Sequence, residues 1–221
     1  MTIRTDPPAE TEPESPSAPS PPAWRRWSTR HRVAAALLAG LVATHIATVL
    51  GFWMGGFGLV RLDWNTANGK VYVPKESPLS QFLIGGGMHY VDGIAFAVLF
   101  AVAIHPRLPW PDTEVGNVVK GLVFGTILAV IALAILTPLI YGPARAADAG
   151  VFSSGFGWKY IVGVFLFHWI YGAHVGLIYS PLPEVDVLPD DSRRDARGGE
   201  VAAPGGRLSP AGRRRRRSPD R

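Results

Sequence analysis

The hydrophobic positions of this chain fall into four long blocks, separated by polar or proline-rich segments. The blocks cover about residues 33–60, 79–104, 118–141 and 158–180. Each block approaches or exceeds the roughly 20 apolar residues that a helix needs to cross about 30 Å of hydrocarbon. The pattern therefore predicts an all-α membrane protein, with four transmembrane helices packed as a four-helix bundle over residues 32–182.

Two of these blocks carry the same residue pattern. Residues 89–100 read HYVDGIAFAVLF and residues 168–179 read HWIYGAHVGLIY, so histidine, small and aromatic positions fall in register. The similarity extends weakly to the other two blocks, where Gly-Leu-Val recurs at residues 40–42 and 121–123. Because each copy contains two helices, both copies start on the same side. The sequence thus predicts two parallel-repeat hairpins, related by an axis along the membrane normal.

Proline, serine and charge collect at the two ends of the chain. Residues 1–31 predict a disordered tail that ends in a basic and aromatic membrane anchor, and residues 183–221 predict a disordered, arginine-rich tail. An even number of spans puts both termini on one side, and the arginines before the first span make that side cytoplasmic by the positive-inside rule. We therefore predict a bacterial plasma (inner) membrane protein with both termini cytoplasmic.

The arginine run at residues 213–217 is interpreted by the same rule. Beside a membrane domain, such a run indicates attraction to anionic lipid headgroups, and nucleic acid is the less favoured partner.

The connections carry their own local signals. Residues 61–78 predict a polar loop with a turn at Asn68-Gly69. Three successive glycines at residues 85–87 indicate tight packing or a local distortion in the second span. His105, beside Pro106 at a helix end, is interpreted as an interfacial histidine.

Small residues at four-residue spacing predict where helices approach one another closely. The positions expected to form these contacts are Gly51, Gly55, Gly93, Ala97, Gly121, Gly125, Gly172 and Gly176.

Polar residues inside the apolar blocks are the candidates for chemistry. His89 and Asp92 lie three residues apart and so share one helix face. A carboxylate at this depth costs a few kcal/mol, so Asp92 should face the bundle interior and be paired or protonated. Two interpretations stay open: a structural hydrogen-bonded knot, or a site that handles protons or ions. The predicted polar core consists of His45, His89, Asp92, His168 and Tyr171.

The histidines are the candidate ligands for a cofactor. Imidazoles from two facing helices can ligate haem iron, so His89 and His168 predict at most one b-type haem. A copper or zinc site made by His45, His89 and His168, with Asp92 in or next to the ligand set, is a further alternative that no spacing selects. The favoured expectation is that no cofactor is bound. Cysteine is absent, which excludes thiolate sites, and no phosphate-binding loop, serine-hydrolase, zinc-protease or kinase motif is found.

The matched segments, of the form H-x-x-x-G-x-x-x-[AG]-x-x-[FY], resemble those of small uncharacterised four-span bacterial integral membrane proteins. The resemblance covers about residues 33–183 and implies a fold but no activity. We expect a non-enzymatic accessory or assembly module in the lipid bilayer, packed against another membrane subunit or further copies of itself. The alternatives are a redox subunit that holds one b-type haem and a small proton-coupled transporter that uses Asp92.

Overall fold

The computed structural model of the chain describes residues 20–183, so the two tails predicted for its ends lie almost wholly outside the described residues. Within this range the chain is helical and contains no strand. Four segments are long and apolar enough to cross a membrane: Arg32–Phe57, Pro78–Arg107, Glu114–Ala144 and Trp158–Ile178. The four hydrophobic blocks are thus confirmed as helices that fit a multi-pass membrane protein.

Two of the spans are built around one regular helix each. The first contains α2 (Arg32–Trp53), which tightens into a 3₁₀ turn at Met54–Phe57, a segment that contains two glycines. The last is α7 (Trp158–Ile178), preceded by a 3₁₀ turn at Val151–Phe156.

The other two spans change pitch part of the way along. Helix α4 (Pro78–Leu99) continues as a π-helical turn at Phe100–Ile104 and a 3₁₀ turn at His105–Arg107. Helix α5 (Glu114–Ile131) continues as a π-helical segment, Ala132–Tyr141, and ends in the short α6 (Gly142–Ala144). The second π-helical segment contains Pro138, which has no N–H to donate and therefore interrupts the regular ladder.

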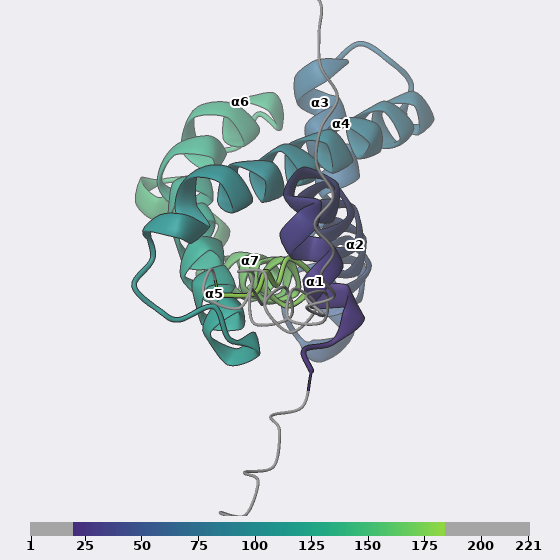
Figure 1. Cartoon of the computed structure of the whole chain (residues 1–221). Coiled ribbons are helices and arrows are strands. Elements are labelled where there is room, and N and C mark those ends of the chain that lie inside the picture. Colours follow the sequence, from purple (N-terminus) through teal and green to yellow (C-terminus); the bar gives the residue numbers. More distant parts are fainter. Residues whose placement is uncertain (1–19, 184–221) are drawn as a thin grey trace, which may run out of the picture. The chain divides into compact units, whose positions relative to one another are not determined.

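The predicted turn at Asn68-Gly69 is wrong, because residues Trp64–Tyr72 form a helix, α3. Asp63 caps this helix by accepting a hydrogen bond from the backbone N–H of Thr66 at 2.9 Å. Helix α3 lies against α4 (Figure 1).

The glycines of α4 explain that close approach. A Cβ atom added to Gly85 would overlap the backbone of α3 at Asn65 and Gly69. Gly86 also faces Asn65, whereas Gly87 has open space beside it. Two of the three successive glycines, Gly85 and Gly86, thus serve tight packing within a regular helix, which was one of the two sequence expectations.

Small residues also mark the contacts between the spanning helices. A Cβ atom on Gly93 of α4 would overlap the Thr44 side chain of α2, and one on Gly172 of α7 would overlap the backbone of Gly121 in α5. Close approaches of this kind involve Gly40, Gly93, Ala97, Gly121, Gly125, Gly172 and Gly176. Gly51 approaches the backbone of Leu62 and the ring of Phe167 in α7, whereas Gly55 has only Arg61 within 4 Å.

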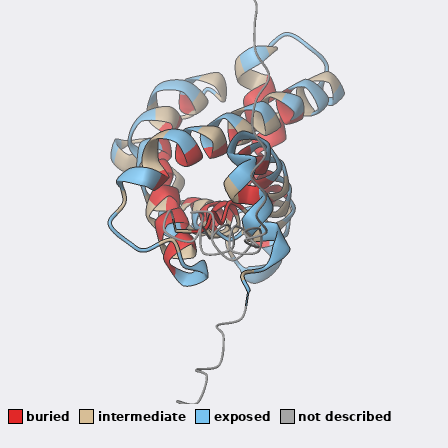
Figure 2. Ribbon diagram, in the orientation of Figure 1, coloured by how far each residue is buried: buried red, intermediate tan, exposed pale blue. Residues whose placement is uncertain are grey.

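The spanning helices pack unequally with one another. Helix α2 packs against α4 and α7, and α5 packs against α7. Helix α4 has no extensive contact with α5, which its continuation at Phe100–Arg107 approaches. Buried residues line the facing sides of the helices and exposed residues their outer sides (Figure 2).

A short helix, α1 (Ala23–Arg30), precedes the first span, at the end of the N-terminal tail where the sequence predicted a basic and aromatic membrane anchor. The Trp24 indole donates to the backbone oxygen of Ile178 at 2.7 Å, and Arg25 donates to that of Pro181 at 3.0 Å. The start and the end of the described chain therefore meet at one end of the bundle, as an even number of spans requires.

Candidate functional site

A cavity of about 450 Å³ lies between α4 and the span that contains α5, with α3 and α7 completing its walls. Its volume falls in the range of small-molecule sites, about 300–1,000 Å³. Its apolar lining consists of Val71, Gly93, Phe96, Leu128, Ile131, Ala132, Leu136, Ile140 and Phe167. Its polar or amphipathic lining consists of Thr44, Trp64, Asn68, Tyr72, His89, Asp92, Tyr141, His168 and Tyr171.

Most of the predicted polar core lies on this one cavity: His89, Asp92, His168 and Tyr171 all line it. His45 does not. It lies on the exposed face of α2, where its Nδ1 is 2.7 Å from the hydroxyl oxygen of Tyr90.

The helical rotation of about 100° per residue separates His45 from the cavity, because its neighbour Thr44 is the residue that faces inward. The predicted three-histidine metal site is therefore not assembled. Between residues 20 and 183, no three His, Asp or Glu side chains form a group that could hold a metal ion.

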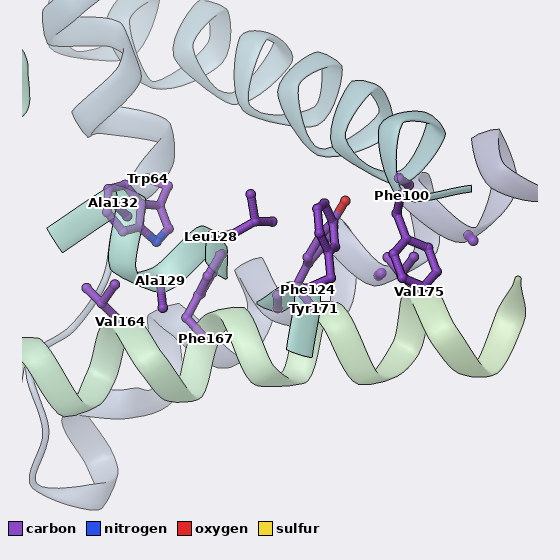
Figure 3. Packing of buried hydrophobic residues seen from close by; sticks show 14 of the residues in the cluster. Trp64, Phe100, Phe124, Leu128, Ala129, Ala132, Val164, Phe167, Tyr171 and Val175 are labelled. Carbon is purple, nitrogen blue, oxygen red and sulfur yellow. The ribbon is translucent and has the colours of Figure 1, made fainter. Parts of the chain in front are cut away.

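Helix α3 and the end of the third span also contribute to the cavity, which the residue pattern did not predict. Tyr141 donates its hydroxyl hydrogen to Oδ1 of Asn68 at 2.5 Å. The Trp64 ring meets Tyr141 and Phe167 edge to face, with centroids 5.4 and 5.9 Å apart. Figure 3 shows Trp64 and Phe167 from different elements meeting beside Leu128. The Asp63 cap before a Trp64–Ala67–Asn68 stripe was the available signal for this helix.

The tautomer of His89 follows from its partner. Its Nε2 lies 3.1 Å from the hydroxyl oxygen of Thr48, and that hydroxyl donates its own hydrogen to the backbone oxygen of Thr44 at 2.7 Å. The Thr48 oxygen must therefore accept, so His89 donates through Nε2–H. As a neutral imidazole, His89 keeps a lone pair on Nδ1.

His168 has the opposite tautomer. Its Nδ1 lies 2.7 Å from the backbone oxygen of Val164, which only accepts hydrogen bonds. His168 therefore donates through Nδ1–H, and as a neutral imidazole it keeps a lone pair on Nε2. The ring of Phe167 packs beside both imidazoles, with its centroid 6.0 Å from that of His89 and 5.4 Å from that of His168.

Asp92 forms no hydrogen bond and no ion pair with any other residue of the described range. The expected knot between Asp92 and a histidine or tyrosine is thus not what the structure shows. Tyr171 instead donates to the backbone oxygen of Gly93 at 2.5 Å. On the α3 side, burial raises the pKa of Tyr72, and the charge of Asp92 raises it further, so the neighbouring phenol stays protonated.

The indole nitrogen of Trp64 is also unpartnered. Trp64 is only 6% exposed, and its Nε1 has no hydrogen-bond partner within residues 20–183. A buried donor left unsatisfied costs about 1–3 kcal/mol. The lining residues therefore include Thr44, Trp64 and Asp92, whose side-chain polar groups have no partner within residues 20–183.

A second polar cluster closes the end of the bundle that carries α1. The Lys120 ammonium lies 2.5 Å from Oδ1 of Asp112, and His105 Nε2 lies 2.9 Å from Oδ1 of Asn117. Asn117 in turn donates to the hydroxyl of Ser180 at 3.0 Å. His105, which was predicted to lie at the membrane interface, is buried in this cluster. Because these groups satisfy one another, we interpret the cluster as structural.

Comparisons of the chain with protein-family models, curated proteins and solved structures found no match. The function is therefore inferred from the chemistry of the cavity.

Proposed function

We propose that the chain is a non-enzymatic multi-pass membrane protein that binds a small lipid-soluble molecule in the cavity between α4 and α5. The observation that carries this proposal is the Asp92 carboxylate, which lines the mostly apolar cavity without a partner among the described residues. An ionisable side chain within a membrane span marks a site for an ion or a substrate. The mixture of apolar walls with a few polar groups is typical of small-molecule sites.

The separation of α4 from α5 supports entry from the bilayer. These helices do not pack along their length, and Phe96 and Ile131, on the two sides of the cavity, are both exposed. A molecule dissolved in the hydrocarbon can pass between such walls without crossing a polar barrier.

The proposed hairpin repeat gives a reason why the cavity lies between α4 and α5. On the outer face of the first hairpin, His45 bonds Tyr90 at 2.7 Å, and at the matching positions of the second, Trp169 donates to Thr126 at 2.9 Å. A symmetric pair of hairpins would close α4 on α5 as α2 closes on α7. In this chain α3 packs on α4 instead, and the space left between α4 and α5 is the cavity.

We further propose that both termini are cytoplasmic in a plasma membrane, as the arginines before the first span predict. As an accessory or assembly module, the protein would hold its ligand for another membrane subunit or within an oligomer of this chain.

The haem alternative meets a steric difficulty. His89 and His168 each keep one free ring nitrogen, but a planar macrocycle held by both would compete with Phe167 for the space beside them. We therefore favour a ligand held by hydrogen bonds. An absorption spectrum of the purified protein decides: a Soret band that is lost in both His89→Ala and His168→Ala would establish the haem instead.

The unpaired carboxylate of Asp92 favours a second candidate, proton-coupled transport of the same ligand. This candidate predicts ligand flux into proteoliposomes that depends on a pH gradient and is abolished by Asp92→Asn in a folded protein. Equal flux in the variant would exclude it.

Photolabelling with a cavity-filling variant tests the proposed function. Ala132 lines the cavity and is buried, whereas Ala134, two positions on, is exposed on the outer face. In lipid nanodiscs, dodecanol and dodecylamine that carry a diazirine should label cavity-lining peptides of the unchanged protein and of Ala134→Trp. Labelling should be lost in Ala132→Trp. Labelling confined to outer faces, or equal in both variants, would contradict the proposal.

A further inference from the structure

We infer that the ligand is an amphipathic organic cation whose head group donates hydrogen bonds, a primary or secondary ammonium carried on an apolar chain or ring. This inference rests on the proposed function and specifies its ligand. It follows from three properties of the cavity: its charge, the direction of its hydrogen bonds and its aromatic walls.

The cavity lining carries negative charge but no lysine or arginine to balance it. Asp92 is the one acidic side chain among the lining residues, and no lysine or arginine accompanies it. Ionisable side chains within a membrane span are paired, or they mark sites for ions or substrates. Since no other described residue pairs with Asp92, a cationic ligand is the counter-ion that the site lacks, and an anionic head group is repelled.

Three side chains of the lining offer hydrogen-bond acceptors to a ligand: His89, Asp92 and His168. Thr48 and Val164 hold the ring N–H groups of His89 and His168, which leaves lone pairs on Nδ1 and Nε2 respectively. The hydroxyl hydrogen of Tyr171 is already donated to Gly93. Two imidazole lone pairs and a carboxylate suit a head group that donates several hydrogen bonds. An ammonium has up to three such hydrogens, whereas a carboxylate or phosphate has few or none.

The aromatic walls favour the same charge. Trp64, Phe167 and Tyr171 all line the cavity, and the faces of such rings attract cations. Leu128 and Ile131 supply apolar surface for the remainder of the molecule.

The test compares head groups on one chain length. Unlabelled dodecylammonium, dodecyltrimethylammonium, dodecanol and dodecanoate compete with the diazirine probes for cavity labelling in phosphatidylcholine nanodiscs at pH 7. The variant is Asp92→Asn, which keeps the side-chain shape, and the matched control is Glu76→Gln, which removes an exposed carboxylate outside the spans. Each competitor is compared between variants, so that its own partition into the bilayer cancels.

We expect Asp92→Asn to weaken competition by dodecylammonium about ten- to hundredfold, the range of a charge-assisted hydrogen bond. Dodecyltrimethylammonium has no hydrogen to donate in a hydrogen bond, so it should compete more weakly for the unchanged protein. Asp92→Asn should reduce its competition less than that of dodecylammonium. Dodecanol should change little, and Glu76→Gln should change nothing. The inference is overturned if Asp92→Asn affects dodecylammonium and dodecanol equally, or affects neither. If no competitor reduces cavity labelling, or no cavity labelling occurs, the proposed function itself fails.

Discussion

Tyr171 of α7 donates its hydroxyl hydrogen to the backbone oxygen of Gly93 in α4, at an O···O distance of 2.5 Å. The two residues belong to different hairpins and both line the cavity. Gly93 also lies against Thr44 of α2, so this hydrogen bond joins three spans at one level. It holds α4 to α7 where α4 lacks contact with α5.

Removing this hydroxyl should weaken the bundle. Tyr171→Phe keeps the ring but loses the hydrogen bond, and we expect the free energy of unfolding to fall by about 0.5–1.5 kcal/mol. Denaturation in mixed detergent micelles measures this change. Tyr72→Phe is the matched control, because Tyr72 is 47% exposed and forms no hydrogen bond with the described residues. Equal effects of the two substitutions would show that the bond to Gly93 contributes nothing.

The α5–α7 contact should be the least tolerant of added volume. A Cβ atom on Gly172 would overlap the backbone of Gly121, so Gly172→Ala should lower the unfolding free energy by about 1–3 kcal/mol. Gly87→Ala adds the same methyl where nothing lies within 4 Å, and should be neutral or stabilising by up to about 1 kcal/mol. Melting temperatures of the purified variants check both. A stable Gly172→Ala would show that the helices are further apart than described.

The Asp112–Lys120 pair provides a double-mutant cycle. The Lys120 side chain is 4% exposed and the Asp112 side chain 30%. Asp112→Ala leaves a buried ammonium without its carboxylate and should cost about 1–3 kcal/mol of unfolding free energy. Asp112→Ala combined with Lys120→Met should recover most of that loss, because no unpaired charge remains. Simple addition of the two single effects would contradict the assigned pairing.

Hydropathy was sufficient to predict the four spans, because a length of apolar helix is a property of contiguous residues. It was also sufficient to predict that His89, Asp92, His168 and Tyr171 lie together inside the bundle, since polar residues inside apolar blocks avoid lipid. His45 satisfied the same rule but lies on the outer face, bonded to Tyr90. The sequence alone did not determine which face of α2 points inward.

Helix α3 and the cavity were not predictable in the same way. Asn68-Gly69 is a turn sequence by local preference, but tight packing of Gly69 on α4 overrides that preference. The gap between α4 and α5 depends on this packing and on the pitch changes at Phe100–Ile104 and Ala132–Tyr141. Such features arise from tertiary contacts, which a residue pattern does not encode.

The most direct measurement is a crystal structure of the protein grown in a lipid mesophase with 12-bromododecylammonium, located by the anomalous scattering of bromine. The account predicts bromine among the apolar residues of the cavity, near Leu128 or Ile131, with the ammonium nitrogen within hydrogen-bonding distance of Asp92. Helix α4 packed along α5 with no cavity, or bromine only on the outer faces of the bundle, would contradict it.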